Sequence, residues 1–165
     1  MIRDQVMNEL SAPVDPESFY VGNPARVSGN SGALASPLTL RVTLNGIPAL
    51  GIGDGIWFDD IWAVLTPTAA LTIQSASLRL VDNTNGVLKT LGMPVFTTLS
   101  LSTSPVTVAF LVQPKLVGFG DLQQYGLTAN IQQPLKVELI LAFSASTLVA
   151  ILGVKARLVR GIQDG

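Results

Sequence analysis

Two stretches near the C-terminus decide the fold: LKVELILAF at residues 135–143 and LVAILGVKARLVR at residues 148–160. In both, apolar side chains occupy every second position, a period of two that is typical of a half-buried β-strand. The two faces consist of Leu135, Val137, Leu139, Leu141 and Phe143, and of Leu148, Ala150, Leu152, Val154, Ala156 and Leu158. We predict that both strands lie in the core and pair as an antiparallel hairpin.

The same period recurs along most of the chain from Pro37 onward. Residues 38–44 alternate, and Asn45-Gly46, a pair favoured in type I′ turns, predicts a returning strand over 47–52. A turn at Asp82–Gly86 separates the predicted strands 71–81 and 87–91. Further strand-like runs cover residues 95–101, 106–112 and 127–132. Eight or nine strands with Gly, Pro and Asn turns predict an all-β protein, a single eight-stranded jelly-roll barrel or sandwich.

Residues 1–36 differ from the rest of the chain. From Ser11 to Ser36 the sequence is rich in Ser, Pro, Gly and Asn, which interrupt any regular period. We therefore predict an N-terminal arm over residues 1–36, extended loop rather than core, and a jelly-roll domain over residues 37–165. Two interpretations of the arm stay open: a loose tail, or a segment that orders against a neighbouring subunit.

Composition excludes several classes of function. The chain has 165 residues, no Cys, no His and a formal net charge of -1. Disulfides, Cys/His zinc sites and His-based catalytic triads are therefore excluded, and the strong basic field of a non-specific nucleic-acid binder is missing. No serine-nucleophile or dinucleotide motif occurs, and Gly51–Gly55 is best interpreted as a turn. We predict a non-enzymatic protein without catalytic, cofactor-binding or metal-binding residues.

Hydropathy is the second unusual property. Mean hydropathy is +0.48 and only 13% of residues are charged, about half the usual share. Such a chain is either membrane-embedded or covered by partners over much of its apolar surface. The uncharged runs 139–154 and 90–114 are too short or too often interrupted by Ser, Thr and Pro for a membrane-spanning helix, and the N-terminus has no secretory pattern.

The segment Trp57-Phe58-Asp59-Asp60-Ile61-Trp62 holds the main candidate contact residues. Trp57 and Trp62 could stack on a sugar while Asp59 and Asp60 accept its hydroxyls, or the carboxylates could bind a hard cation. Neighbours in a strand point to opposite faces, which argues against a catalytic acid pair. The alternatives are an interface and a loop whose tryptophans anchor in the core.

Two further aromatic residues are candidate contacts. Phe119 and Tyr125 lie in a glycine-containing segment and look exposed, so either interface use or packing within the loop is open.

A small all-β chain with no His or Cys, a polar N-terminal arm and surplus apolar residues resembles the single jelly-roll capsid proteins of viruses. More narrowly, it resembles the small major capsid protein of tailless icosahedral phages with an internal membrane that infect thermophilic bacteria. The resemblance implies a shell subunit made in the host cytoplasm and located in the virion. It also implies association with itself and with a second coat protein, contact with an internal viral membrane, no cofactor and no specific nucleic-acid binding.

A ligand-binding sandwich is the alternative hypothesis, either a carbohydrate-binding module or a phage fibre or adhesion domain. A flat exposed row containing Trp57 and Trp62 would favour sugar binding. Buried tryptophans and apolar flanks would favour a shell.

Overall fold

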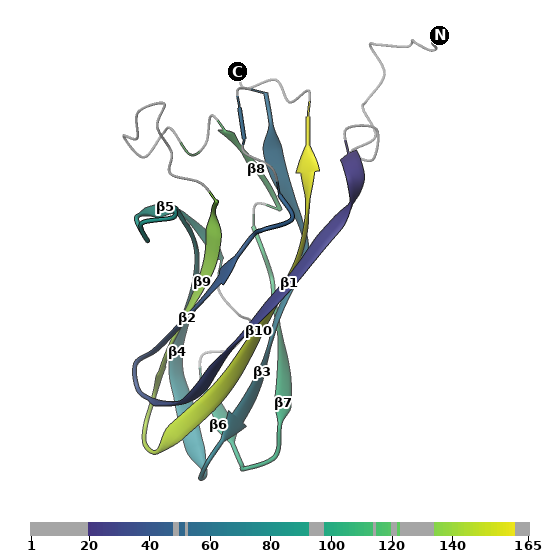
Figure 1. The fold of residues 1–165 in the computed structure, drawn as a ribbon. Coiled ribbons are helices and arrows are strands. Elements are labelled where there is room, and N and C mark those ends of the chain that lie inside the picture. The colour runs from purple at the N-terminus through teal and green to yellow at the C-terminus, as the bar shows by residue number, and fades with distance from the viewer. Residues whose placement is uncertain are drawn as a thin grey trace, which may run out of the picture.

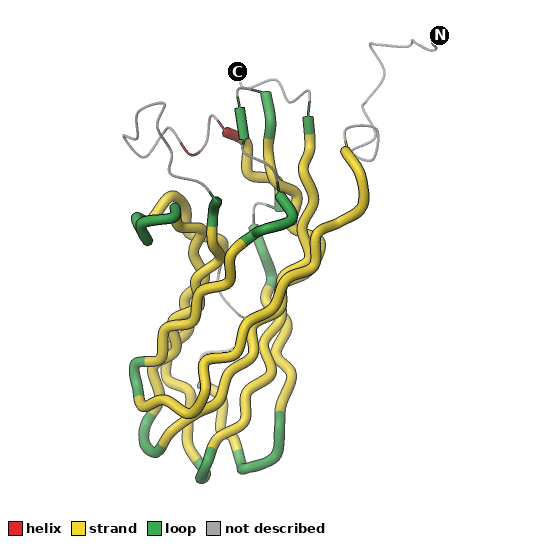
Figure 2. The backbone as a smooth tube through the Cα atoms, viewed as in Figure 1, coloured by secondary structure: helices red, strands yellow, loops and turns green. Residues whose placement is uncertain are grey.

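A computed structural model describes residues 20–47, 50–51, 53–92, 98–113, 115–119, 122 and 134–160. Strands dominate this part of the chain (Figures 1 and 2). The strands are β1 (Tyr20–Ala35), β2 (Leu38–Thr43), β3 (Gly55–Pro67), β4 (Leu71–Val81), β5 (Val87–Gly92), β6 (Leu99–Leu101), β7 (Val106–Phe110), β8 (Leu116–Gly118), β9 (Lys136–Phe143) and β10 (Thr147–Val159). No helix in the described residues is long and apolar enough to cross a bilayer.

The strands form two antiparallel sheets that pack face to face (Figure 1). Sheet A has the order β1-β10-β3-β7, with β8 following β7 along the same edge of β3. Sheet B has the order β2-β9-β4-β5, with β6 beside the other end of β4. When β5 and β6 count as one broken strand, and β7 and β8 as another, each sheet is four strands wide.

The pairing is nested from the ends of the chain toward its middle. β1 pairs with β10, β2 with β9, β3 with β7 and β8, and β4 with β5 and β6. A long antiparallel ribbon paired in this way, then rolled so that β10 meets β3 and β9 meets β4, is a jelly roll. The all-β jelly-roll prediction is confirmed.

The core fills the space between the sheets. Inward positions carry mainly Leu, Ile, Val, Phe and Ala, and they come from both sheets. The inner faces predicted for residues 135–143 and 148–160 are buried. Alternation along these two stretches therefore correctly identified which of their side chains enter the core.

The predicted hairpin of β9 and β10 is wrong. Residues 144–146 connect β9 in sheet B to β10 in sheet A, so the two strands do not share a ladder. Both edges of each are already occupied, because β2 and β4 flank β9 while β1 and β3 flank β10. Their apolar faces meet across the core instead.

The interpretation of residues 20–35 as loop is also wrong, because they form β1. Its ladder with β10 has irregularities between Val21 and Ala25 and between Asn30 and Ala33. The second is a bulge: Gly32 has φ +71°, and the Ser31 hydroxyl accepts the Ala150 N–H at 3.0 Å. Gly, Pro and Ser at these irregularities hide the strand from periodicity. From residue 26 onward β1 places no fully buried side chain. The domain boundary at 36/37 stays a prediction.

Other local predictions had mixed outcomes. The strand over 71–81 coincides with β4, and the turn at Asp82–Gly86 is confirmed by the Asp82 N–H to Gly86 carbonyl bond of 2.9 Å. Asn45-Gly46 forms a turn, but no returning strand occurs at the described residues 47, 50 and 51. The predicted strand over 127–132 lies outside the described residues.

Candidate interaction surfaces

The Trp57–Trp62 segment is part of β3, with a bulge at Asp59. Lys155 of β10 lies opposite Asp60 and Ala156 opposite Phe58, so Asp59 has no register partner. The extra residue shifts the alternation, which keeps Phe58 and Ile61 buried on the inner side. Trp57, Asp59, Asp60 and Trp62 consequently share the outer face of sheet A. The expectation that the two carboxylates point to opposite faces is wrong.

Trp62 covers Gly153 of β10, its direct partner across the two strands. A Cβ at Gly153 would lie 2.2 Å from both Cε2 and Cζ2 of the indole ring. The ring therefore occupies the space that any side chain at residue 153 would need. Both tryptophans are half-buried on the outside of the sheet, so their interpretation as core anchors of a loop is wrong.

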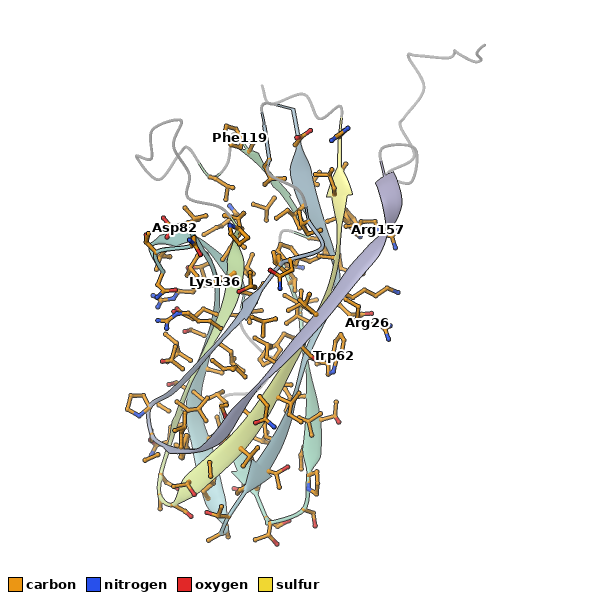
Figure 3. The ribbon with its side chains drawn as sticks, in the orientation of Figure 1. Arg26, Trp62, Asp82, Phe119, Lys136 and Arg157 are labelled. Atoms are coloured by element: carbon orange, nitrogen blue, oxygen red, sulfur yellow. The ribbon has the colours of Figure 1, made fainter. Side chains whose placement is uncertain are left out.

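Charged groups occupy one half of this outer face. Arg157 donates from Nε to Oδ2 of Asp59 at 2.9 Å, and both side chains are about one-fifth exposed. The next row contains Arg26 on β1, Lys155 on β10 and Asp60 on β3, directly opposite one another. Figure 3 shows Arg26, Trp62 and Arg157 along this sheet. Directly opposed like charges, as at Arg26 and Lys155, are unfavourable in a sheet.

Apolar side chains lie at the centre of the other half. Beyond Trp62, the outward positions on the two central strands are Val64 and Thr66 on β3 and Val149 and Ile151 on β10, with Asn30 of β1 and Thr107 of β7 on either side. Ile151 is 37% exposed, a large value for an isoleucine, and Val64 and Val149 are half-buried. Sheet A thus presents an apolar area that Trp62 separates from the charged rows.

The outer face of sheet B carries a buried ion cluster. Glu138 on β9 is 1% exposed between Arg41 of β2 and Arg79 of β4, which are its direct cross-strand neighbours. Arg41 Nε donates to Oε2 at 2.8 Å, and Arg79 donates from both Nε and Nη2 to Oε1. Two guanidinium groups therefore compensate one desolvated carboxylate.

A turn at the edge of sheet B is also stabilised by polar contacts (Figure 3). Burial raises the pKa of Asp82, but the Thr84 hydroxyl, the Gly86 and Thr84 amides and the charge of Lys136 outweigh it and hold that pKa below its usual value. Lys136 also donates to the Asn83 carbonyl at 3.2 Å and to Asn85 Oδ1 at 3.1 Å.

The remaining candidate residues lie elsewhere. Phe119 is only 7% exposed and belongs to the core. The expectation that its side chain is exposed is therefore wrong. Tyr125 lies outside the described residues. Among those that are described, no group of three or more acidic side chains is placed to hold a metal ion.

Sequence reasoning missed Gly153 and the Arg41, Glu138 and Arg79 cluster. A glycine inside the alternating run 148–160 was the available signal for the first, because such a glycine often marks close approach of another group. The cluster had no local signal, since its members are 38 and 59 residues apart in sequence and meet only through strand register.

Comparisons with known proteins give only distant similarities. No protein-family model matches the sequence, and no curated protein matches it. A chain of infectious bursal disease virus, Gt strain, matches with TM-score 0.34 and 10% identity, over 89% of this chain and 36% of that one. The chain thus spans about a third of that viral protein's length.

Two other solved structures that match come from a different virus and from a bacterial enzyme. A chain of turnip yellow mosaic virus matches with TM-score 0.34 and 11% identity, over 86% of this chain and 96% of that one. The N-terminal cellulose-binding domain of Cellulomonas fimi β-1,4-glucanase C matches with TM-score 0.32 and 17% identity, over 87% and 82%. The jelly-roll assignment rests on the strand pairing and not on these similarities.

Proposed function

We propose that this chain is a structural subunit of an icosahedral virus shell, built by lateral packing of jelly-roll domains. The supporting observation is that large apolar side chains are exposed on opposite edges of the sandwich. Leu34, 43% exposed, lies on edge strand β1. Val87, 41% exposed, lies on β5 and Leu111, 50% exposed, directly follows β7, both at the other edge.

A subunit with exposed apolar side chains on two opposite edges can contact one further copy at each edge, which suits repeated assembly. A head-to-tail contact joins two different surfaces, so each subunit must present both, and such contacts form a closed ring when the rotation between subunits closes and a filament when it does not. Isolated exposed apolar residues are ordinary on monomers. Their position on both edges, in a chain of mean hydropathy +0.48, is what favours lateral packing.

The finer assignments follow from the resemblance to small phage capsid proteins. The subunit is made in the host cytoplasm, joins a shell together with a second coat protein, and resides in the virion. One surface of the shell contacts an internal membrane, and the genome is not recognised specifically.

Substitutions that place a charge on one apolar edge at a time test this proposal. Leu34→Asp and Leu111→Asp should each reduce association of the full chain, measured by sedimentation velocity, while Thr103→Asp at an exposed turn should not. Mixing the two edge variants should produce discrete heterodimers, because one intact interface remains between them. Association that neither variant reduces would contradict lateral packing.

A carbohydrate-binding role has one observation in its favour. The bulge at Asp59 brings two carboxylates to the same outer face as Trp57 and Trp62, and aromatic rings beside carboxylates suit sugar recognition. Affinity electrophoresis on soluble cellulose derivatives distinguishes the two functions. Retardation that Trp62→Ala abolishes, by a protein that stays monomeric, would replace the shell proposal with a binding module.

A further inference from the structure

Two Asn-Gly pairs occur in the sequence, Asn45-Gly46 and Asn85-Gly86, and all four residues are exposed. An asparagine followed by glycine is prone to a reaction with its own backbone. The glycine nitrogen, once it has lost its proton, attacks the carbon of the asparagine side-chain amide, because glycine has no Cβ to obstruct the approach. The two pairs share this sequence but differ in their hydrogen bonds, so the fold should determine which of them reacts.

Asn45 and Gly46 are the central residues of the turn that follows β2. The Ile47 N–H closes this turn by donating to the Leu44 carbonyl at 3.1 Å, and the Asn45 N–H donates to the Thr43 carbonyl at 2.9 Å. Within the residues that the structure describes, neither the Asn45 side chain nor the Gly46 N–H forms a hydrogen bond. The attacking nitrogen and the amide that it attacks are therefore both free to react.

The corresponding groups of Asn85-Gly86 are engaged in hydrogen bonds. The Gly86 N–H donates to Oδ1 of Asp82 at 2.8 Å, and Asn85 Oδ1 accepts from Lys136 Nζ at 3.1 Å. Loss of the Gly86 proton would break a charge-assisted hydrogen bond and leave two negative charges facing each other. Lys136 polarises the Asn85 amide, which by itself favours attack, but Asp82 holds the nitrogen that would have to attack.

We propose that Asn45 is a site of spontaneous deamidation and that the Asp82 turn protects Asn85 from the same reaction. The Gly46 nitrogen gives its proton to hydroxide and bonds to Cγ of Asn45. The Cγ–Nδ2 bond then breaks, and Nδ2 takes a proton from water and leaves as ammonia. A further water molecule opens the resulting succinimide ring at either carbonyl, which leaves aspartate or isoaspartate at residue 45.

The reaction changes the charge of the molecule. Each conversion replaces a neutral amide with a carboxylate and so adds one negative charge to a chain whose formal net charge is -1. Protein that has aged in solution should therefore contain an acidic species that fresh protein lacks. This inference is independent of the shell function, because it depends only on the two turns.

Peptide mapping of the folded full-length protein tests the proposal. Trypsin places the two asparagines in separate peptides, residues 42–79 and 80–89. During incubation at mildly alkaline pH, Asn45 should convert about tenfold to a hundredfold faster than Asn85, as expected when one site must first lose a hydrogen bond to a charged acceptor. Mass spectrometry measures both conversions, and ion exchange should show the acidic species growing at the rate of the Asn45 product.

Substitutions and unfolding separate the effect of the hydrogen bond from that of the sequence. Asp82→Ala removes the acceptor of the Gly86 N–H, so Asn85 should convert at a rate close to that of Asn45. Gly46→Ala is the matched change at the other turn and should remove most of the acidic species, because the added Cβ obstructs the attack. In guanidinium chloride, where both turns are unfolded, the two asparagines should convert at similar rates.

Three results would overturn the inference. The first is conversion of Asn85 in the folded protein as fast as that of Asn45. The second is a difference that persists in guanidinium chloride, since the sequence and not the fold would then account for it. The third is continued protection of Asn85 in Asp82→Ala protein whose tryptophan fluorescence shows it to be folded. The guanidinium comparison needs no variant, so it decides the question even if Asp82→Ala does not fold.

Discussion

Strands β9 and β10 have nearly the same inward pattern but very different outward faces. β9 directs Leu139 into the core and β10 directs Leu152 into it, and both are fully buried. On the outside, β9 holds Glu138 between two arginines, whereas β10 holds Gly153 beneath Trp62 and leaves Lys155 opposite Arg26. Sheet B therefore satisfies its own charges. On sheet A, Lys155 lies between Arg26 and Asp60 in the cross-strand register, and Ile151 is exposed.

The largest expected effect on stability comes from the leucines that β9 and β10 both place in the core. Leu139→Ala and Leu152→Ala should each lower the free energy of unfolding by about 2–5 kcal/mol, because each leaves a cavity in the common core. Denaturant unfolding monitored by tryptophan fluorescence measures this. Ile151→Ala, next to Leu152 but exposed, should change stability by about 0.5 kcal/mol or less. Equal effects at 151 and 152 would mean that the inward assignment of β10 is incorrect.

The ion cluster on β9 comes next. Glu138→Gln should cost about 2–3 kcal/mol, less than for fully buried pairs because Arg41 and Arg79 remain about one-third exposed. Asp59→Asn breaks the pair with Arg157 on the other sheet, in which both side chains are about one-fifth exposed, and should cost about 1 kcal/mol or less. Replacing Arg41, Glu138 and Arg79 together with apolar residues should recover much of the loss. Equal costs for Glu138→Gln and Asp59→Asn would contradict the account that the ion cluster of sheet B stabilises the fold more than the ion pair of sheet A.

Substitution of the glycine on β10 should lower the free energy of unfolding by a smaller amount. Gly153→Ala should cost about 1–3 kcal/mol, because its methyl group overlaps the Trp62 ring and forces it away from the strand. A red shift in tryptophan emission should accompany the loss. In a Trp62→Ala background the same substitution should be nearly neutral, and an undiminished penalty there would show that the ring is not the obstacle.

The smallest effect is the pH dependence of the Asp82 turn beside β9. Since the pKa of Asp82 is lowered in the folded protein, its carboxylate stabilises the fold above the unfolded pKa of about 4, and this stabilisation is lost as pH falls through the folded pKa. Asp82→Asn should therefore cost about 1 kcal/mol or less at pH 7. The difference from the unaltered protein should shrink below pH 4 in acid unfolding curves. A constant difference would reject the carboxylate's role.

Periodicity predicted the strands whose two faces differ in burial. β9 and β10 alternate over most of their length, so their inward residues were identified from the sequence alone, and β4 was identified as a strand. β1 was missed because, from residue 26, it buries no side chain fully and because Gly, Pro and Ser occupy its irregular positions. β3 was missed because the bulge at Asp59 shifts its alternation by one residue.

Strand partners could not be read from local pattern. β9 and β10 are adjacent in sequence and equally apolar, and only the competing partners β2, β4, β1 and β3 place them in different sheets. The same limit applies to the surfaces. Trp57, Asp59, Asp60 and Trp62 were identified as candidates, but their common face depends on a bulge, and the opposition of Arg26 to Lys155 depends on register.

Sedimentation velocity of the unaltered full-length protein tests the shell function most directly. The protein is compared over a wide concentration range at low salt and at about 1 M NaCl, where the Debye length falls to about 3 Å. Lateral packing through apolar edges predicts concentration-dependent assemblies that persist at high salt. A protein that stays strictly monomeric at the highest concentration, alone and mixed with candidate coat proteins, would contradict it.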